Sequence, residues 1–171
     1  MKVLQILNNI DRRIIYLLLS IVVIIPLLLE LEIDISPGPY AKTVFNEIQN
    51  EFGSSANPQS NKKILLSFDY GPSTSTEVNP MGFSIMKQVL LTGNEVHTMA
   101  LFDTGIAVSE QIKKELASDY DLIEKYGTES SIYNKIVELG YASGGEAAIK
   151  NMLKNIHKVF PAAPSNIENL C

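Results

Sequence analysis

The sequence has no tryptophan, one cysteine and two histidines among its 171 residues. The cysteine, Cys171, is the last residue, which excludes an intrachain disulfide and any metal site built from several cysteines. His97 and His157 stand alone and lack the spacing of metal ligands, so we expect no bound metal. We expect His97 to be packed within a sheet rather than to be catalytic, because it lies in the middle of a predicted strand.

Basic side chains are outnumbered, with 14 Lys and Arg against 19 Asp and Glu and a formal charge of −5. A protein of this charge has no electrostatic surface for a phosphate backbone, so we expect no nucleic-acid partner. Neither a Gly-x-Gly-x-x-Gly motif nor a Walker-type loop occurs, and we therefore expect no nucleotide cofactor. Apolar residues make up 46% of the chain, which excludes wholesale disorder and suffices for one domain with a core.

Two fragments of catalytic motifs occur without the residues that would complete them. Residues 102–105 contain the Asp-Thr-Gly triplet of aspartic proteases, which need two such aspartates; only a homodimer could supply the second. Ser84 and Lys87 have the Ser-x-x-Lys spacing of penicillin-binding enzymes, but the Ser-Asp-Asn and Lys-Thr-Gly motifs are missing. We interpret both matches as chance and identify no catalytic residue.

The longest apolar run begins at Ile14, ends at Leu29 and contains no charged residue. Such a run predicts a transmembrane helix, with the lipid bilayer as its partner, and apolar positions continue to Ile33. Arg12 and Arg13 precede the run and acidic residues follow it, so the positive-inside rule places the N-terminus in the cytoplasm. We predict a cytoplasmic segment at 1–13, a signal anchor at 14–33 and a cell-membrane location with the rest extracytoplasmic. A cleaved signal peptide and a buried core helix are the alternatives.

The rest of the chain alternates predicted helices and strands. Apolar periodicity indicates helices within 40–52, 79–93, 106–117 and 147–160, whereas short apolar runs indicate strands at 63–69, 94–102 and 135–139. This alternation is typical of an α/β fold, a small Rossmann-like parallel sheet with flanking helices, over residues 36–160. Residues 118–134 show no clear period, and 161–171 form a tail. Three strands are few, so the sheet is either small or the first half of a larger domain.

Local signals place two of the helix starts. Asn79 followed by Pro80 is typical of an N-cap and a first helical position. Ser143 and Glu146 have the spacing of a capping box.

Ligands of doubly wound sheets bind at the carboxyl ends of the strands. Candidate ligand-binding residues therefore come from the three loops that follow the predicted strands. They are Asp69, Tyr70 and Gly71, then Asp103, Thr104 and Gly105, then Tyr141, Ser143, Gly144 and Gly145. The last loop leads into a helix N-terminus, whose free N–H groups favour an anion.

Residues 64–72, then Glu77 and Pro80, then residues 139–145 resemble an uncharacterised family of membrane-anchored prokaryotic proteins. Members begin with one transmembrane helix and continue with a strand that ends in Ser-Phe-Asp-Tyr-x-Pro. The resemblance covers about residues 10 to 160 and implies an α/β fold that continues beyond residue 171. It departs at residues 100–105, where the family would have an aromatic residue and a proline.

These observations lead to three hypotheses about function. The first is a membrane-anchored domain that binds a ligand or a partner or serves as a scaffold. The second is an extracytoplasmic hydrolase or transferase that uses Asp69 and Asp103 as carboxylates. The third is a subunit of a membrane complex, in which the apolar helix also contacts partner proteins.

Overall fold

The computed structural model describes residues 11–28, 36–59, 62–161, 163–165 and 167. The chain divides into two compact units, Met1–Gly38 and Pro39–Cys171. Helix α2 (Arg12–Leu28) lies in the first unit. The second, which we call the α/β unit, has the following elements in order: α3 (Pro39–Phe52), β1 (Gly53–Ser54), β2 (Asn57–Pro58), β3 (Lys63–Ser67), α4 (Ser75–Leu91), β4 (Glu95–Ala100), α5 (Gly105–Ala117), α6 (Tyr120–Tyr126), α7 (Glu129–Tyr133), β5 (Ile136–Tyr141), α8 (Glu146–Lys154) and the 3-10 turn η1 (Ile156–Lys158).

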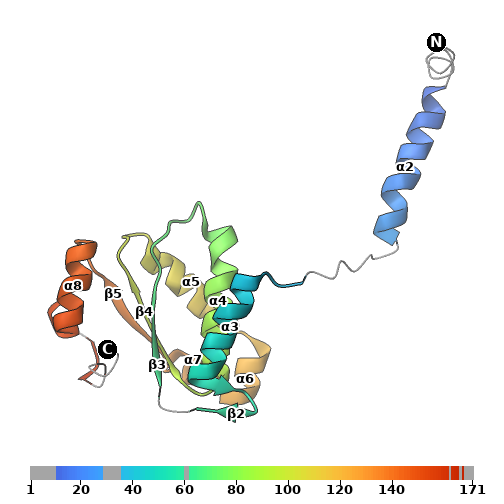
Figure 1. Cartoon of the computed structure of the whole chain (residues 1–171). Helices are drawn as coiled ribbons and strands as arrows, with labels where there is room; N and C mark the ends of the chain where they lie inside the picture. Colours follow the sequence, from blue (N-terminus) through green and yellow to red (C-terminus); the bar gives the residue numbers. More distant parts are fainter. Residues whose placement is uncertain (1–10, 29–35, 60–61, 162, 166, 168–171) are drawn as a thin grey trace. The chain divides into compact units, whose positions relative to one another are not determined.

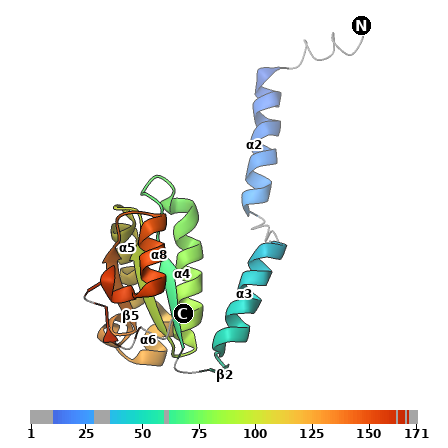
Figure 2. The same ribbon diagram turned by 60° about the vertical axis from the view of Figure 1, so that its left-hand side comes forward.

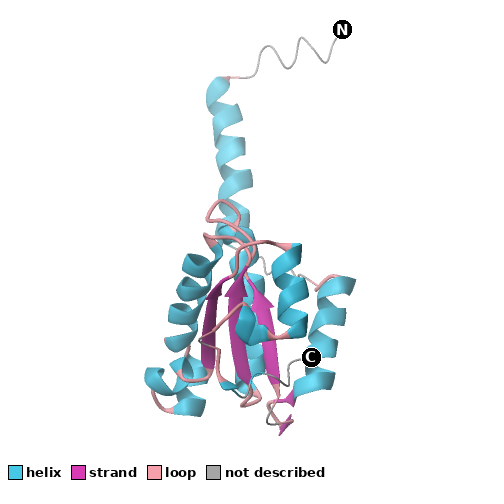
Figure 3. Ribbon diagram, turned by 90° about the vertical axis from the view of Figure 1, so that its left-hand side faces the viewer, coloured by secondary structure: helices cyan, strands magenta, loops and turns pink. Residues whose placement is uncertain are grey.

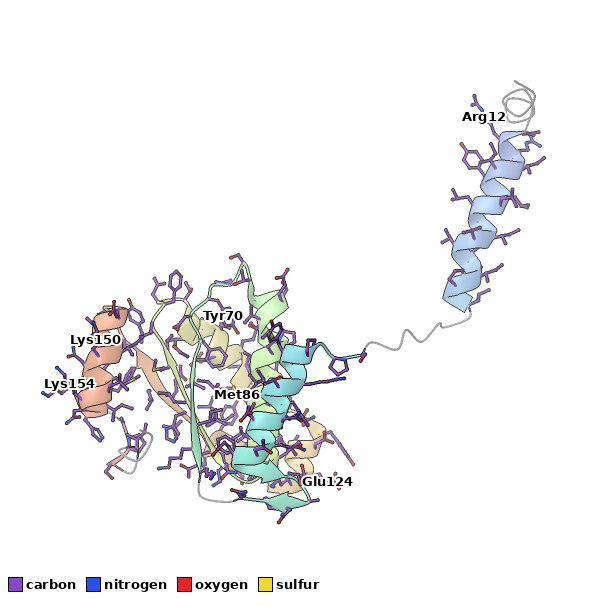
Figure 4. All side chains as sticks on the ribbon, viewed as in Figure 1. Arg12, Tyr70, Met86, Glu124, Lys150 and Lys154 are labelled. Atoms are coloured by element: carbon purple, nitrogen blue, oxygen red, sulfur yellow. The ribbon has the colours of Figure 1, made fainter. Side chains whose placement is uncertain are left out.

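Helix α2 is 17 residues long, with Arg12 at its start (Figure 4) and Pro26 near its end. Its described side chains are all exposed. At a rise of 1.5 Å per residue the helix reaches about 26 Å. Among the described residues, no helix has both the length and the apolar character required to cross a membrane. Residues 29–33 of the predicted anchor lie outside the described residues.

The centre of the α/β unit is a three-stranded sheet in the order β3-β4-β5. Both pairings are parallel, so the three carboxyl ends lie along one edge, as the arrowheads in Figure 3 show. This confirms the predicted α/β class with a small parallel sheet. The 3-10 turn and the described residues after it also contribute to the fold, since Phe160 and Ile167 are buried.

The sheet is covered on both faces because its side chains alternate between two cores. Ile64 and Leu66 pack against a core formed with α3, α4 and α5, whereas Leu65 packs against a second core under α8 and η1. Figures 1 and 2 show α8 on one side of the sheet and α4 and α5 on the other. Met86 of α4 is fully buried in the first core, between its helix and the strands (Figure 4).

The predicted start of the second domain helix is wrong. Helix α4 begins at Ser75, because turn hydrogen bonds such as Val78 N–H to Thr74 O already form there. Asn79 is therefore not the N-cap but a buried residue inside the helix. Pro80 lies in the second turn, where its missing N–H removes one helical hydrogen bond.

The predicted capping box is also wrong. The N-cap of α8 is Gly145, with φ of 51°, and no side chain caps this helix. Two successive glycines with positive φ, Gly144 and Gly145, bring the chain into the helix by a route that keeps Ser143 from the N-cap position. The helix ends at Lys154 rather than 160, since Asn155 is extended and its side chain accepts the N–H of His157 to start η1.

The stretch without clear periodicity, 118–134, forms two short helices. Asp119 caps α6 by accepting the N–H of Leu122, and Thr128 caps α7 by accepting the N–H of Ser131. Helices of this length have too few turns to show an apolar period in the sequence. Each is stabilised at its start by a side-chain cap instead.

Candidate functional site

The loops after β3 and β4 meet at the carboxyl edge of the sheet. A Cβ on Gly105 would overlap the carbonyl oxygen of Phe68, so the start of α5 can approach the end of β3 only because residue 105 is glycine. A Cβ on Gly71 would lie 3.4 Å from Oγ1 of Thr104. Two of the three predicted loops therefore contact each other directly.

Asp69 joins these two loops through one carboxylate oxygen and contacts its own strand through the other. Its Oδ1 accepts the N–H of Leu101 at 2.6 Å, and its Oδ2 accepts the hydroxyl of Ser67 at 2.8 Å. Charge-assisted hydrogen bonds of this kind are stronger than neutral ones. In this arrangement the carboxylate stabilises the loops, with one hydrogen bond to each oxygen.

Tyr70 turns inward at the same edge. Its hydroxyl donates to Oδ1 of Asn79 at 3.0 Å, and its ring lies 6.1 Å from the ring of Phe68 (Tyr70 is labelled in Figure 4). Burial raises the pKa of the Tyr70 hydroxyl, which keeps it protonated as a donor. This contact also satisfies the side-chain oxygen of Asn79, which is buried inside α4: its Oδ1 accepts from a half-buried phenol.

Asp103 and Thr104 lie directly before α5. Oδ1 of Asp103 accepts the N–H of Thr104 at 2.8 Å, and the carboxylate is otherwise exposed. Oγ1 of Thr104 is buried and has no hydrogen-bond partner in the part of the chain that the structure describes.

The third loop joins the same edge through β4. The N–H of Ala142 donates to the carbonyl of Ala100 at 2.8 Å, while Tyr141, Ser143, Gly144 and Gly145 are exposed. Helices α4, α5 and α8 all begin at this edge, and none has a side-chain cap. Acidic side chains stand beside these starts, Glu77 on α4, Asp103 before α5 and Glu146 on α8, and they oppose binding of an anion.

This edge offers little for acid–base or metal chemistry. The described residues contain no group of three or more His, Cys, Asp or Glu side chains that could hold a metal ion. Asp69 is hydrogen-bonded internally at both oxygens, and Asp103 is hydrogen-bonded to the backbone beside it. The observed contacts are those of a loop junction built from Asp69, Tyr70 and Gly105.

A second feature lies between α3 and α4 and was not predicted as a site. It is a groove of about 410 Å³, which we call the α3–α4 groove. Its lining contains no charged side chain and consists of Tyr40, Ala41, Val44, Phe45, Ile48, Met81, Ser84, Ile85 and Gln88. Both its size and its apolar lining are typical of sites that bind other molecules.

The apolar residues of α3 were predicted as one face of an amphipathic helix, and only part of that face is buried. Of that face, Ile48 and Phe52 enter the first core, whereas Phe45 is 50% exposed and Val44 48%. Tyr40, which was not predicted as part of the face, is 87% exposed. Met81 of α4 adds a further side chain that is 63% exposed. The signal in the sequence is an apolar stripe longer than the core it packs against, but only the structure shows which half stays uncovered.

Comparisons of this chain with protein-family models, with curated proteins and with solved structures find no match.

Proposed function

We propose that this protein is a membrane-tethered docking domain, in which α2 holds the α/β unit at a bilayer and the α3–α4 groove binds a partner polypeptide. The observation that carries the proposal is the exposed apolar lining of the groove on the first helix of the α/β unit. Contiguous exposed apolar surface that is rimmed by polar residues marks interaction sites in soluble domains.

The tether rests on the composition of α2. From Ile14 to Leu28 the helix has no charged residue, and its described apolar side chains are exposed all around. A helix that is apolar on every side requires an apolar environment rather than the surface of a membrane. Its length of about 26 Å is shorter than the bilayer core of about 30 Å, and Arg12 and Arg13 can extend to the headgroups from its first turn.

The same flanking charges support the orientation. Arg12 and Arg13 precede the helix, which favours a cytoplasmic N-terminus and an extracytoplasmic α/β unit. Three basic and one acidic side chain precede residue 30, which leaves 11 and 18 beyond it, a formal charge of −7. An acidic domain is repelled by anionic lipids, so the groove is available to a protein partner rather than to the membrane surface.

The docking surface is supported by how α3 is held. The Nε2 of Gln88 on α4 donates to the carbonyl of Phe45 at 3.2 Å, which fixes the two helices together along the groove. Ile48 lines the groove and is also part of the first core, so the lining continues that core to the surface. A groove on fixed helices binds with a small entropic cost.

The experiment that tests docking is photo-crosslinking in membranes from cells that express the full chain. A benzoylphenylalanine at Val44 is expected to give a discrete adduct with one partner protein. The matched control places the same residue at Lys154, which is exposed on the outer side of α8 (Figure 4). No adduct from position 44, or the same adducts from both positions, would contradict the proposal.

A further inference from the structure

A hollow between α4 and α5, which we call the α4–α5 pocket, is separate from the α3–α4 groove. Its volume is about 410 Å³, within the range of roughly 300–1,000 Å³ that is typical of small-molecule sites. The two helices pack against each other, and α5 contributes Gln111 and Glu115 to a lining that otherwise comes from α4. The pocket shares no lining residue with the α3–α4 groove, so the two can be tested separately.

Asn79 is the buried polar side chain of this lining, and it is only 9% exposed. Its Oδ1 accepts the hydroxyl of Tyr70 at 3.0 Å, which fixes the orientation of the amide. Its Nδ2 has no hydrogen-bond partner among the described residues, yet it is not one of their fully enclosed unpaired atoms. A ligand in the pocket can therefore reach a fixed N–H donor that needs a partner.

Two acceptors lie around the same pocket. Because Pro80 has no N–H, the carbonyl of Thr76, four residues earlier, lacks its usual donor within the helix, and both residues line the pocket. On α5, Oε1 of Glu115 accepts Nε2 of Gln111 at 3.0 Å, and the described residues provide no other side-chain partner for that carboxylate. The α4–α5 pocket thus combines one fixed donor with a main-chain acceptor and a carboxylate acceptor.

The charges around the pocket disfavour ions of either sign. Its lining contains no Lys, Arg or His, while Glu115 in the lining and Glu77 in the first turn of α4 repel an anion. A cation meets the N–H donor of Asn79 and the start of α4, where the helix dipole is positive. The ligand that fits is therefore uncharged and carries both donors and acceptors.

Hydroxyl groups meet this requirement well, because each of them both donates and accepts. Pro80 and the half-buried Phe83 form the apolar part of the lining. A sugar ring carries hydroxyls around its rim and C–H groups on its faces. It can therefore bond to the amide, carbonyl and carboxylate groups of the pocket while a C–H face packs against Phe83.

We propose that the α4–α5 pocket binds an uncharged sugar ring, with Nδ2 of Asn79 donating to one hydroxyl and with Gln111 and Glu115 bonded to others. The inference goes beyond partner docking, because it assigns a ligand of different chemistry to a different surface of the α/β unit. Either proposal can fail without the other, since the two sites have no residue in common.

The test is an NMR titration of the full chain, labelled with nitrogen-15, in dodecylphosphocholine micelles, which carry no sugar. The side-chain amide signals of Asn79 are assigned by their loss in Asn79→Asp, which keeps an acceptor for Tyr70. The probes are the methyl glycosides of glucose, galactose, mannose and N-acetylglucosamine. At least one of them is expected to shift these signals in a saturable way, whereas sodium acetate and methylguanidinium chloride at the same concentration are expected to leave them unchanged.

Gln111→Ala removes an exposed amide of the lining and is expected to weaken the affinity for that glycoside by about fivefold or more. Lys114→Ala is the matched control, because Lys114 is exposed on the same helix but lies outside the lining, and it is expected to bind within about twofold of the wild type.

If no glycoside shifts the Asn79 signals, or if acetate or methylguanidinium shifts them instead, the inference is overturned. Equal affinities of Gln111→Ala and Lys114→Ala would overturn it as well. An array of immobilised neutral glycans then separates two sources of the same chemistry. Binding of the full chain to the array supports a glycan as the ligand, whereas a shift with a soluble glycoside and no array binding supports a free sugar.

Discussion

Gly105 is the residue on which the junction of the two strand-end loops depends most directly. Its position directly opposite the Phe68 carbonyl leaves no room for a methyl group, and the Cβ of Ala100 is also close to where that group would lie. A side chain here would force the start of α5 away from β3, although the backbone conformation itself is an ordinary helical one. The glycine is required by close approach and not by φ.

Gly105→Ala is therefore expected to destabilise the α/β unit by about 2 kcal/mol or more, as overpacking against fixed backbone does. The measurement is urea unfolding of the full chain in micelles, followed by tyrosine fluorescence. Gly38→Ala serves as the control, because nothing lies within 4 Å of a Cβ at that position, and it is expected to change stability by less than about 0.5 kcal/mol. Equal stability of the two variants would show that the junction can relax.

His97 is a buried histidine whose ring nitrogens both lack a hydrogen-bond partner among the described residues. Burial lowers its pKa, and the positive charge of Lys63 lowers it further, while Glu95, whose Oε2 is 3.7 Å from Nε2, raises it. Lys135 lies 3.8 Å from the other oxygen of Glu95 and competes for that carboxylate. The folded protein therefore favours the neutral ring.

This pKa predicts a loss of stability in weak acid. The pKa of His97 in the folded protein is below its unfolded value of about 6.5. The neutral ring therefore imposes no loss of stability above pH 6.5. As the pH decreases from 6.5, the free energy of unfolding decreases by up to about 1.4 kcal/mol per pH unit. His97→Met, which keeps the volume and removes the titrating group, is expected to flatten this fall between pH 7 and pH 5. Burial raises the pKa of Glu138, so protonation of this carboxyl increases stability as the pH decreases. This opposite effect is present in both the wild type and His97→Met.

The measurement for His97 is the free energy of unfolding at pH 5, 6 and 7. His157→Gln controls for loss of a histidine as such and is expected to retain the wild-type fall. Parallel pH profiles for wild type and His97→Met would contradict the assigned role of burial.

At the scale of elements, the sequence predicted every strand of the parallel sheet, because buried parallel strands are short apolar runs between helices. Strand β4 lies within the predicted 94–102, and β3 within 63–69. The predicted third strand ended at 139, because Gly140 indicated a turn. In the structure β5 continues to Tyr141 through a bulge. Helix starts were predicted less well, since α4 and α8 begin without side-chain caps.

The candidate site, too, could be predicted only in part from the sequence. Position at a strand end was enough to single out Asp69 and Gly105, and the structure does bring their loops together. The sequence position alone could not show that the carboxylate oxygens of Asp69 accept hydrogen bonds from Ser67 and Leu101, because those contacts depend on the register of β3 and β4. Nor could periodicity show which half of the apolar face of α3 is left exposed, because that depends on where α3 contacts α4.

Helices α4 and α6 are joined by a shared ion pair that gives a test at this scale. Nζ of Lys87 lies 2.8 Å from Asp119 and 2.7 Å from Asp121, and both carboxylates raise the pKa of Lys87. Asp119 also caps α6 through the N–H of Leu122. Asp119→Ala removes the cap and one ion pair and is expected to cost about 1 to 3 kcal/mol.

Lys87→Met is the matched variant, since it keeps the apolar stem and leaves the cap in place. It is expected to cost less than Asp119→Ala, within about 1 kcal/mol. Because the folded pKa of Lys87 is raised, its contribution is present below the unfolded pKa and is lost as pH rises through the folded value. Thermal unfolding of both variants shows which one loses more stability. A larger loss for Lys87→Met than for Asp119→Ala would show that the cap is unimportant.

At the scale of the whole molecule, the described residues form one apolar helix and one acidic α/β unit, and the proposed function assigns them different environments. If the α/β unit is extracytoplasmic, protease added to intact spheroplasts is expected to digest it, while a tag at the N-terminus survives. If the α/β unit is digested only after the membrane has been permeabilised, the orientation is the opposite of the one proposed.

The most direct test of the central claim is alkaline carbonate extraction of membranes that contain the full chain. The wild-type protein is expected to remain in the pellet, as is the conservative variant Val22→Leu with Val23→Leu. Val22→Arg with Val23→Arg places two charges in the middle of α2, each costing about 3 kcal/mol on insertion, and is expected to appear in the supernatant. Release of the wild-type protein by carbonate, or retention of the arginine variant in the pellet, would contradict a membrane tether.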